Sequence, residues 1–180
     1  MTTILCLSGS LRKDSSTSAF LKTLVDQMQD AAAFRFAEIG HLPHYNADLG
    51  IPGDVGAFKD AIERADGLLI VTPEYNYSVP GVLKNAIDWA SRPAYLSVFK
   101  EKPVFIVTVS GGALGGVRAQ AHLKYIMNGM LADVFVNQEV VVPHAPKKVE
   151  NGRFTDMDVL DFARSAVSEF IAAIKVKDAA

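Results

Sequence analysis

Residues 3–18 read TILCLSGSLRKDSSTS and place a short apolar run directly before a polar loop rich in hydroxyl groups. The run from Thr3 to Ser8 has the length and composition of a strand buried on both faces, as strands of parallel sheets are. After the loop, apolar residues recur at helical spacing, and Ser16, Thr17 and Ser18 are available as helix caps just before them. The stretch therefore predicts a strand, a loop and a helix, in that order.

The same alternation continues along the rest of the chain. Further strands are expected at Phe34 to Glu38, Leu68 to Thr72, Val104 to Val109 and Val134 to Val142, the last interrupted at Asn137 to Glu139. Helical spacing of apolar residues predicts helices over 20–28, 55–65, 80–90, 117–131 and 155–176. Because parallel crossovers are right-handed and bury their strands, these units predict a three-layer α/β/α sandwich. Its five-stranded parallel sheet should have the order 2-1-3-4-5.

Composition narrows the class of protein. A length of 180 residues with 49% hydrophobic side chains fits a single domain spanning 1–180. Eighteen basic and twenty acidic side chains leave a formal charge of -2, which gives no strong field to attract nucleic acid or an anionic membrane. The single Cys6 excludes an intrachain disulfide. Without a signal peptide or an apolar stretch of about 20 residues, we expect a cytoplasmic protein with no membrane or nucleic-acid partner.

Ligands of such sheets bind beyond the carboxyl ends of the strands, near the point where strand order reverses. The loops after strands one, three and four should therefore converge. The first loop, Gly9 to Ser18, combines backbone donors, hydroxyls and Arg12 ahead of a helix start, which suits an anion. It matches neither G-x-x-x-x-G-K-[ST] nor G-x-G-x-x-G, so a monophosphate is favoured. A serine-rich turn with solvated Arg12 and Lys13 is the alternative for this loop alone.

The second loop, Thr72 to Pro80, reads TPEYNYSVP and suits a flat heteroaromatic ring. Prolines stiffen both of its ends, Tyr75 or Tyr77 can lay an aromatic face near a ligand, and Asn76 offers a donor and an acceptor. For Glu74, a solvated or helix-capping carboxylate is favoured over a catalytic acid. Lys84 and Asp88, four residues apart on the following helix, should form a surface pair.

The third loop, Ser110 to Gly116, reads SGGALGG. Its glycines permit close approach of the backbone to a ring edge and positive φ angles, although a flexible connection is the alternative. No metal site is expected: His41 and His44 lie in a turn-rich loop and should be surface residues. His122 and His144 are expected to lie apart from the pocket.

Taken together, the three loops carry a family resemblance. The matching motifs are Gly9-Ser10-x-Arg12 with Ser15, Pro73-Glu74-Tyr75-Asn76 with Pro80-Gly81, and Ser110-Gly111-Gly112 with Gly115-Gly116. Through them the chain resembles, over nearly its whole length, the NAD(P)H-dependent FMN reductases, which have a flavodoxin-like fold. Within that family it is similar to the quinone, chromate and azo-compound reductases.

The resemblance implies an enzyme that passes hydride from NADH or NADPH to FMN and then to a small acceptor such as a quinone, free flavin, azo compound or chromate. It implies a homodimer or homotetramer and names no certain catalytic side chain, because the chemistry belongs to the flavin. The implied FMN-binding residues are Ser10, Arg12, Ser15, Ser16 and Thr17 at the phosphate, and Pro73, Glu74, Tyr75 and Asn76 at the ring, helped by Gly111 and Gly112. Ser110 is also expected to bind the cofactor.

Two positions depart from the family pattern. Asp14 stands where a glycine is common, and its carboxylate is expected to face solvent or to pair with Lys13. Thr17 stands where an asparagine is common, and it keeps a hydroxyl for donation. A non-enzymatic, flavodoxin-like electron carrier is the alternative function, although the near-neutral charge offers such a carrier little docking charge.

Overall fold

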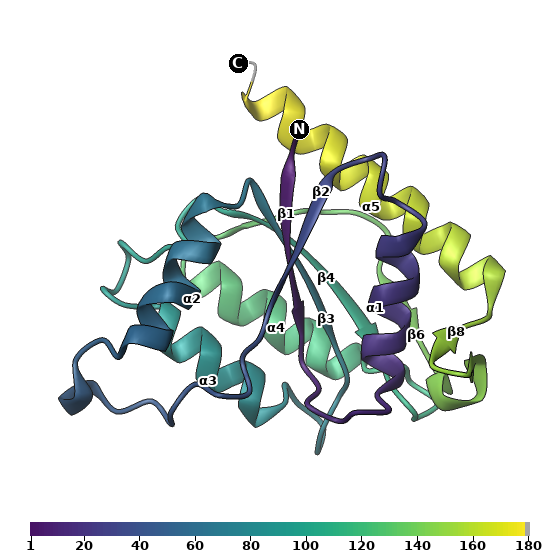
Figure 1. The fold of residues 1–180 in the computed structure, drawn as a ribbon, viewed down its shortest axis with the longest axis horizontal. Helices are drawn as coiled ribbons and strands as arrows, with labels where there is room; N and C mark the ends of the chain where they lie inside the picture. Colours follow the sequence, from purple (N-terminus) through teal and green to yellow (C-terminus); the bar gives the residue numbers. More distant parts are fainter. Residues whose placement is uncertain (179–180) are drawn as a thin grey trace.

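The computed structural model describes residues 1–178 and shows a parallel sheet with helices on both faces (Figure 1). The strands of the sheet are β1 (Thr3–Ser8), β2 (Ala33–Ala37), β3 (Gly67–Thr72), β4 (Pro103–Val109), β5 (Asp133–Val134) and β6 (Val140–Val142). The α-helices are α1 (Ser16–Asp26), α2 (Gly53–Arg64), α3 (Gly81–Ala90), α4 (Val117–Gly129) and α5 (Met157–Asp178). Two 3-10 turns, η1 (Ala47–Leu49) and η2 (Ala145–Lys148), and a small hairpin of β7 (Val149–Glu150) and β8 (Arg153–Phe154) complete the chain.

The sheet has the predicted order, β2-β1-β3-β4-β5, with every pairing parallel. The predicted last strand is present as two pieces, because the chain leaves the sheet at the expected interruption. Val134 of β5 pairs with Val104, and Val140 of β6 pairs with Val107, so both pieces add to β4. The α/β, flavodoxin-like architecture is confirmed.

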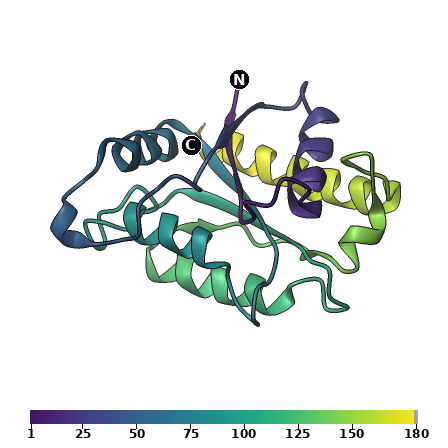
Figure 2. The same ribbon diagram turned by 60° about the horizontal axis from the view of Figure 1, so that its bottom comes forward.

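Strand alternation distributes the core over the two faces of the sheet. Ile4 and Cys6 of β1 pack with α1 and α5, whereas Leu5 and Leu7 pack with α2, α3 and α4. Figures 1 and 2 show these two helical layers on either side of the sheet. All six residues of β3 are buried, as expected for the central strand of a sheet covered on both faces.

The N-cap of the first helix lies one residue before the predicted caps. Ser15 is the N-cap, in an extended conformation, and its Oγ accepts from the backbone N–H of Ser18 at 3.3 Å. Ser16, Thr17 and Ser18 lie in the first turn, so the prediction that one of them caps the helix is wrong. None of the helices in the described part of the chain has both the length and the apolar character of a membrane span.

Candidate functional site

The three loops predicted to converge do meet at the carboxyl edge of the sheet. The N–H of Gly9 donates to the carbonyl of Val71 at 2.9 Å. A Cβ placed on Gly9 would lie 2.1 Å from Thr72 Oγ1, so no side chain fits between the first loop and the end of β3. The hydroxyl of Thr17 donates to the carbonyl of Val109 at 3.0 Å, which ties the start of α1 to the end of β4.

The start of α1 presents free backbone donors at this edge. Ser15 uses its Oγ to accept from Ser18 and its carbonyl to accept from Ala19 at 2.9 Å. The N–H groups of Ser16 and Thr17 find no acceptor within residues 1–178. Unpaired N–H groups and the positive end of the helix dipole make this helix start attractive to an anion.

Other predicted phosphate residues surround this helix start. Ser10 is buried, and its Oγ accepts from the N–H of Arg12 and lies 3.4 Å from Tyr75 Oη. Arg12 is exposed and forms no ion pair within the described chain. Asp14 is exposed, as expected. The hydroxyl of Thr17, by contrast, donates to the carbonyl of Val109, which leaves its N–H as the unpaired donor of this residue.

The second loop is a tight two-residue hairpin. Tyr75 and Ser78 exchange two backbone hydrogen bonds of 3.0 Å, and Asn76 and Tyr77 between them have φ angles of 47° and 67°. Two consecutive left-handed residues are typical of a type I′ turn. A bulky residue with positive φ is strained, and here the guanidinium of Arg118 lies 4.6 Å from the centre of the Tyr77 ring. The hairpin is therefore held against α4.

Glu74 caps α4, as expected from the sequence. Its Oε2 accepts from the N–H groups of Arg118 and Ala119 at 3.1 and 3.3 Å, and its Oε1 accepts from the Arg118 guanidinium at 3.2 Å. Gly116, the N-cap of α4, has no side chain to do this. Because the Glu74 carboxylate is engaged in these three bonds, it joins the second loop to the helix that follows the third, and it is not free to act as an acid.

The glycines of the third loop divide into two pairs. Gly115 and Gly116 have φ angles of 59° and 93°, and a Cβ on Gly115 would lie 2.9 Å from the carbonyl carbon of Val142. The predicted positive φ is therefore found in this pair. Gly111 and Gly112 lack it, and a Cβ on Gly112 would meet nothing within 4 Å. Gly112 faces open space at the site.

His122 contacts the second loop but lines neither of the two cavities beside the first loop, so its expected place apart from the pocket stays a prediction. Its Nδ1 lies 3.0 Å from Ser78 Oγ, at the base of the second loop. The sequence could have indicated this contact with the second loop, because Arg118 and His122 are four residues apart on a helix that starts directly after the third loop. The N–H of His144 likewise donates to the carbonyl of Gly112 at 3.3 Å.

The first loop separates two cavities. One, of about 400 Å³, lies between the first and second loops and the start of α3; its lining residues are Leu11, Arg12, Tyr75, Pro80, Gly81 and Val82. The other, of about 450 Å³, lies between β1, α1 and the segment 36–41. Leu11 lines both.

Along residues 1–178, no cluster of three His, Cys, Asp or Glu side chains could hold a metal ion.

The family of the chain follows from comparison with known proteins. The sequence profile of the NADPH-dependent FMN reductases matches residues 2–147. The chain belongs to this family. It is 40% identical over 171 residues to a 2-hydroxy-1,4-benzoquinone reductase from a Burkholderia species, with 93% of each chain covered. It is 39% identical over 183 residues to a quinone reductase of Escherichia coli, with 96% of this chain and 97% of the relative covered.

A solved structure agrees with both the fold and the family. The flavoenzyme NAD(P)H:(acceptor) oxidoreductase FerB from Paracoccus denitrificans superposes with a TM-score of 0.88 at 37% identity, covering 97% of this chain and 98% of its own. The protein is an FMN-dependent oxidoreductase with NAD(P)H as co-substrate. The resemblance inferred from the three loops is confirmed, and these comparisons give no support to the electron-carrier alternative.

The residues at the sheet edge fit this cofactor. Ser16 and Thr17 supply two unpaired N–H groups for a phosphate, while Gly112 leaves open space on the side of the third loop. The cavity of about 400 Å³ between the first and second loops has the size of a small-ligand site.

Proposed function

We propose that this chain is a quinone-type reductase in which residues 9–17 hold the FMN phosphate and the second and third loops border its ring. The observation that carries the proposal is the pair of unpaired N–H groups, on Ser16 and Thr17, at the point where the three loops meet. A helix start with free donors is the usual place for a phosphate in α/β proteins.

Side chains of the first loop complete the phosphate site. Ser15 accepts through its Oγ as an N-cap, which leaves its O–H free to donate to a phosphate oxygen. Ser10 is placed in the same way, since its Oγ accepts from the Arg12 N–H. Arg12 brings a cation that forms no ion pair within residues 1–178, and an Arg–phosphate hydrogen bond is stronger than one between neutral groups. Asp14 is exposed and need not oppose the phosphate.

The second and third loops are suited to border a flat ring. Pro73, Tyr75 and Asn76 belong to a hairpin that its own hydrogen bonds and the Glu74–Arg118 contacts hold in one shape. Ser110, Gly111 and Gly112 approach from the other side with little side-chain bulk. When bound, FMN supplies the hydride chemistry itself, and the loops position and shield it.

The proposal also covers the electron acceptor, the oligomeric state and the cellular compartment of the protein. A quinone is a flat acceptor that can take the place of nicotinamide over the ring, and the relatives compared above are named as quinone reductases. We infer a homodimer or homotetramer, supported by apolar side chains left exposed on the third loop and on α4: Leu114, Val117 and Tyr125. The cytoplasm, which holds NAD(P)H, is the compartment that fits the activity.

Titration of the flavin-free protein with FMN tests the phosphate site. Arg12→Ala should raise the Kd for FMN about tenfold or more, because a charge-assisted bond contributes about 1.5–3 kcal/mol. Lys13→Ala is the matched control, an exposed neighbouring cation, and should change the Kd less than about twofold. At saturating flavin, Arg12→Ala should leave kcat near that of the parent protein, since Arg12 contacts phosphate. Equal FMN affinity in Arg12→Ala and parent would remove Arg12 from the site.

A further inference from the structure

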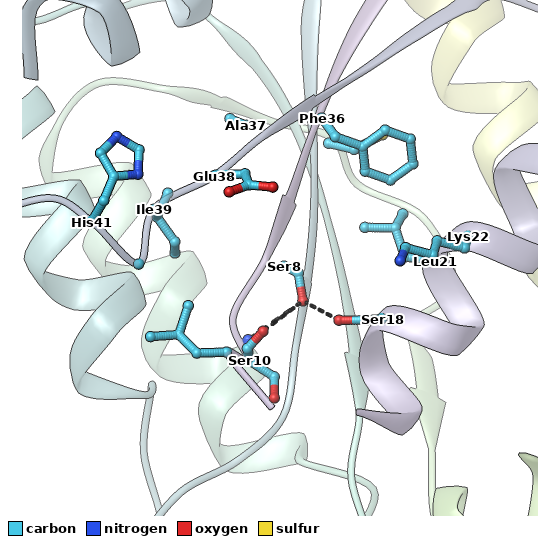
Figure 3. Close-up of a pocket in the computed structure, with 13 residues that line it drawn as sticks. Ser8, Ser10, Ser18, Leu21, Lys22, Phe36, Ala37, Glu38, Ile39 and His41 are labelled. Carbon is cyan, nitrogen blue, oxygen red and sulfur yellow. Dashed lines mark hydrogen bonds between the residues drawn. The ribbon is translucent and has the colours of Figure 1, made fainter. Parts of the chain in front are cut away.

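The cavity of about 450 Å³ on the β2 side of the first loop shares only Ser10 and Leu11 with the FMN site proposed above. Its walls come from the end of β1, the first turns of α1 and residues 36–41 (Figure 3). Its volume lies within the range of about 300–1,000 Å³ typical of small-molecule sites. It shares Leu11 with the cavity of about 400 Å³, so the two lie on opposite sides of the loop proposed to hold phosphate.

One wall offers an aromatic face. Phe36 pairs in register with Cys6, so its side chain lies on the α1 side of the sheet, where β2 is the edge strand. It remains 51% exposed, although Phe34, two residues earlier on the same face, packs against the core. Leu21 of α1 also lines the cavity. An apolar ring exposed inside a cavity suits a planar heterocycle.

Three exposed polar side chains in the cavity lack partners within residues 1–178. Glu38 directly follows β2 and, like Lys22 and His41, is exposed, lines the cavity and forms no ion pair there. Near the first loop, Ser8 Oγ lies 3.1 Å from Ser18 Oγ, as Figure 3 shows. The cavity therefore offers an acidic acceptor, the ammonium group of Lys22 and an imidazole as well as hydroxyls.

A comparable arrangement of groups binds dinucleotides in other α/β proteins. In α/β proteins with a G-x-G-x-x-G loop, a dinucleotide places its diphosphate at the start of the first helix, and an acidic side chain at the end of the second strand accepts hydrogen bonds from its ribose hydroxyls. The first loop here lacks that motif, so the shared feature is the position of the acidic side chain. Glu38 occupies that position relative to β2 and the start of α1. Lys22, on the second turn of the helix, can neutralise a phosphate.

We propose that this cavity binds an adenosine 5′-phosphate group, with FAD as its source. The proposal rests on the placement of the flavin phosphate at the first loop. In FAD a second phosphate continues from the first, and Ser10 and Leu11 of the proposed phosphate loop also line the second cavity, which places that cavity next to the phosphate. Adenine lies against Phe36, and the ribose hydroxyls donate to Glu38. NADH carries the same group, but its diphosphate would have to share the cradle with the FMN phosphate, against like-charge repulsion.

The test is a fluorescence titration of flavin-free protein with FAD and, separately, with FMN. Glu38→Gln should raise the Kd for FAD about tenfold, because an amide binds hydroxyl donors less strongly than a carboxylate does, and should leave the Kd for FMN within about twofold. Glu150→Gln removes an exposed carboxylate that lines neither cavity, and should change neither constant. An unchanged FMN affinity also reports that Glu38→Gln is folded.

A second arm measures the KM for NADH of FMN-loaded Glu38→Gln. A raised KM with an unchanged Kd for FAD would keep the adenosine site but make NADH its source and overturn FAD. If neither constant moves while FMN binds normally, the adenosine site is wrong and the proposed function stands. Failure of the parent protein to bind FMN would instead overturn the proposed function.

Discussion

Gly9→Ala tests whether the close approach of the first loop to β3 builds the site. Gly9 is buried, and its added Cβ would lie 2.1 Å from Oγ1, 2.7 Å from Cβ and 3.1 Å from Cα of Thr72. Rotation of the Thr72 side chain can move Oγ1 but not Cβ or Cα. Thr72 is itself fully buried at the end of the central strand, so the two backbones must separate.

The expected cost follows from that geometry. Overpacking a well-packed interior costs about 1–3 kcal/mol, and a clash with backbone atoms belongs at the upper end. We expect Gly9→Ala to lower the free energy of unfolding by about 2–3 kcal/mol. For a chain of this length, that corresponds to a fall in Tm of about 5–10 °C. FMN affinity should fall as well, because the first and second loops move apart.

Urea unfolding followed by circular dichroism measures the first effect, and flavin titration the second. Gly112→Ala is the matched control, since it adds the same methyl group at the same sheet edge where nothing lies within 4 Å. Its free energy of unfolding should stay within about 0.5 kcal/mol of the parent. A Gly9→Ala protein as stable as the Gly112→Ala protein would refute the reasoning.

Three further predictions concern single groups. Burial raises the pKa of the Cys6 thiol to about 12, so a thiol reagent at about pH 8 should label native protein far more slowly than protein in urea; equal rates would contradict its burial. Hydrogen bonding from Lys148 lowers the pKa of Asp156 from its usual 3.8, so its stabilising effect is present above about pH 4 and lost as pH falls through the folded-state pKa. In acid unfolding, Asp156→Asn should therefore lack the loss of stability that the parent protein shows as pH falls through this pKa. Lys84→Ala should cost less than about 0.5 kcal/mol in urea unfolding, because its 2.7 Å pair with Asp88 is partly exposed; a larger loss would show a buried role.

The sheet was predictable because its signals are local. The buried runs of β1, β3 and β4 and the turn residues after them fix both the strands and the edge where the loops meet. The break at Asn137 to Glu139 even marks where the last strand divides. The β7–β8 hairpin was not predicted, since its two-residue strands are too short to show any periodicity.

Side-chain roles were less predictable, because they depend on residues far apart in the sequence. Thr17 turns its hydroxyl to Val109, 92 residues away, and no local pattern shows that contact. Ser15 rather than its neighbours caps α1, which is decided by a single residue's backbone conformation. The capping role of Glu74 was favoured from sequence, but its partners on α4 were not.

The central claim is that a flavin phosphate binds at the start of α1 while the ring lies between the second and third loops. A crystal structure of the protein with FMN tests it most directly. It should show phosphate oxygens about 3 Å from the backbone nitrogens of Ser16 and Thr17, and the ring beside Tyr75 and Gly112. A phosphate bound elsewhere, with those two N–H groups facing solvent, would contradict the claim.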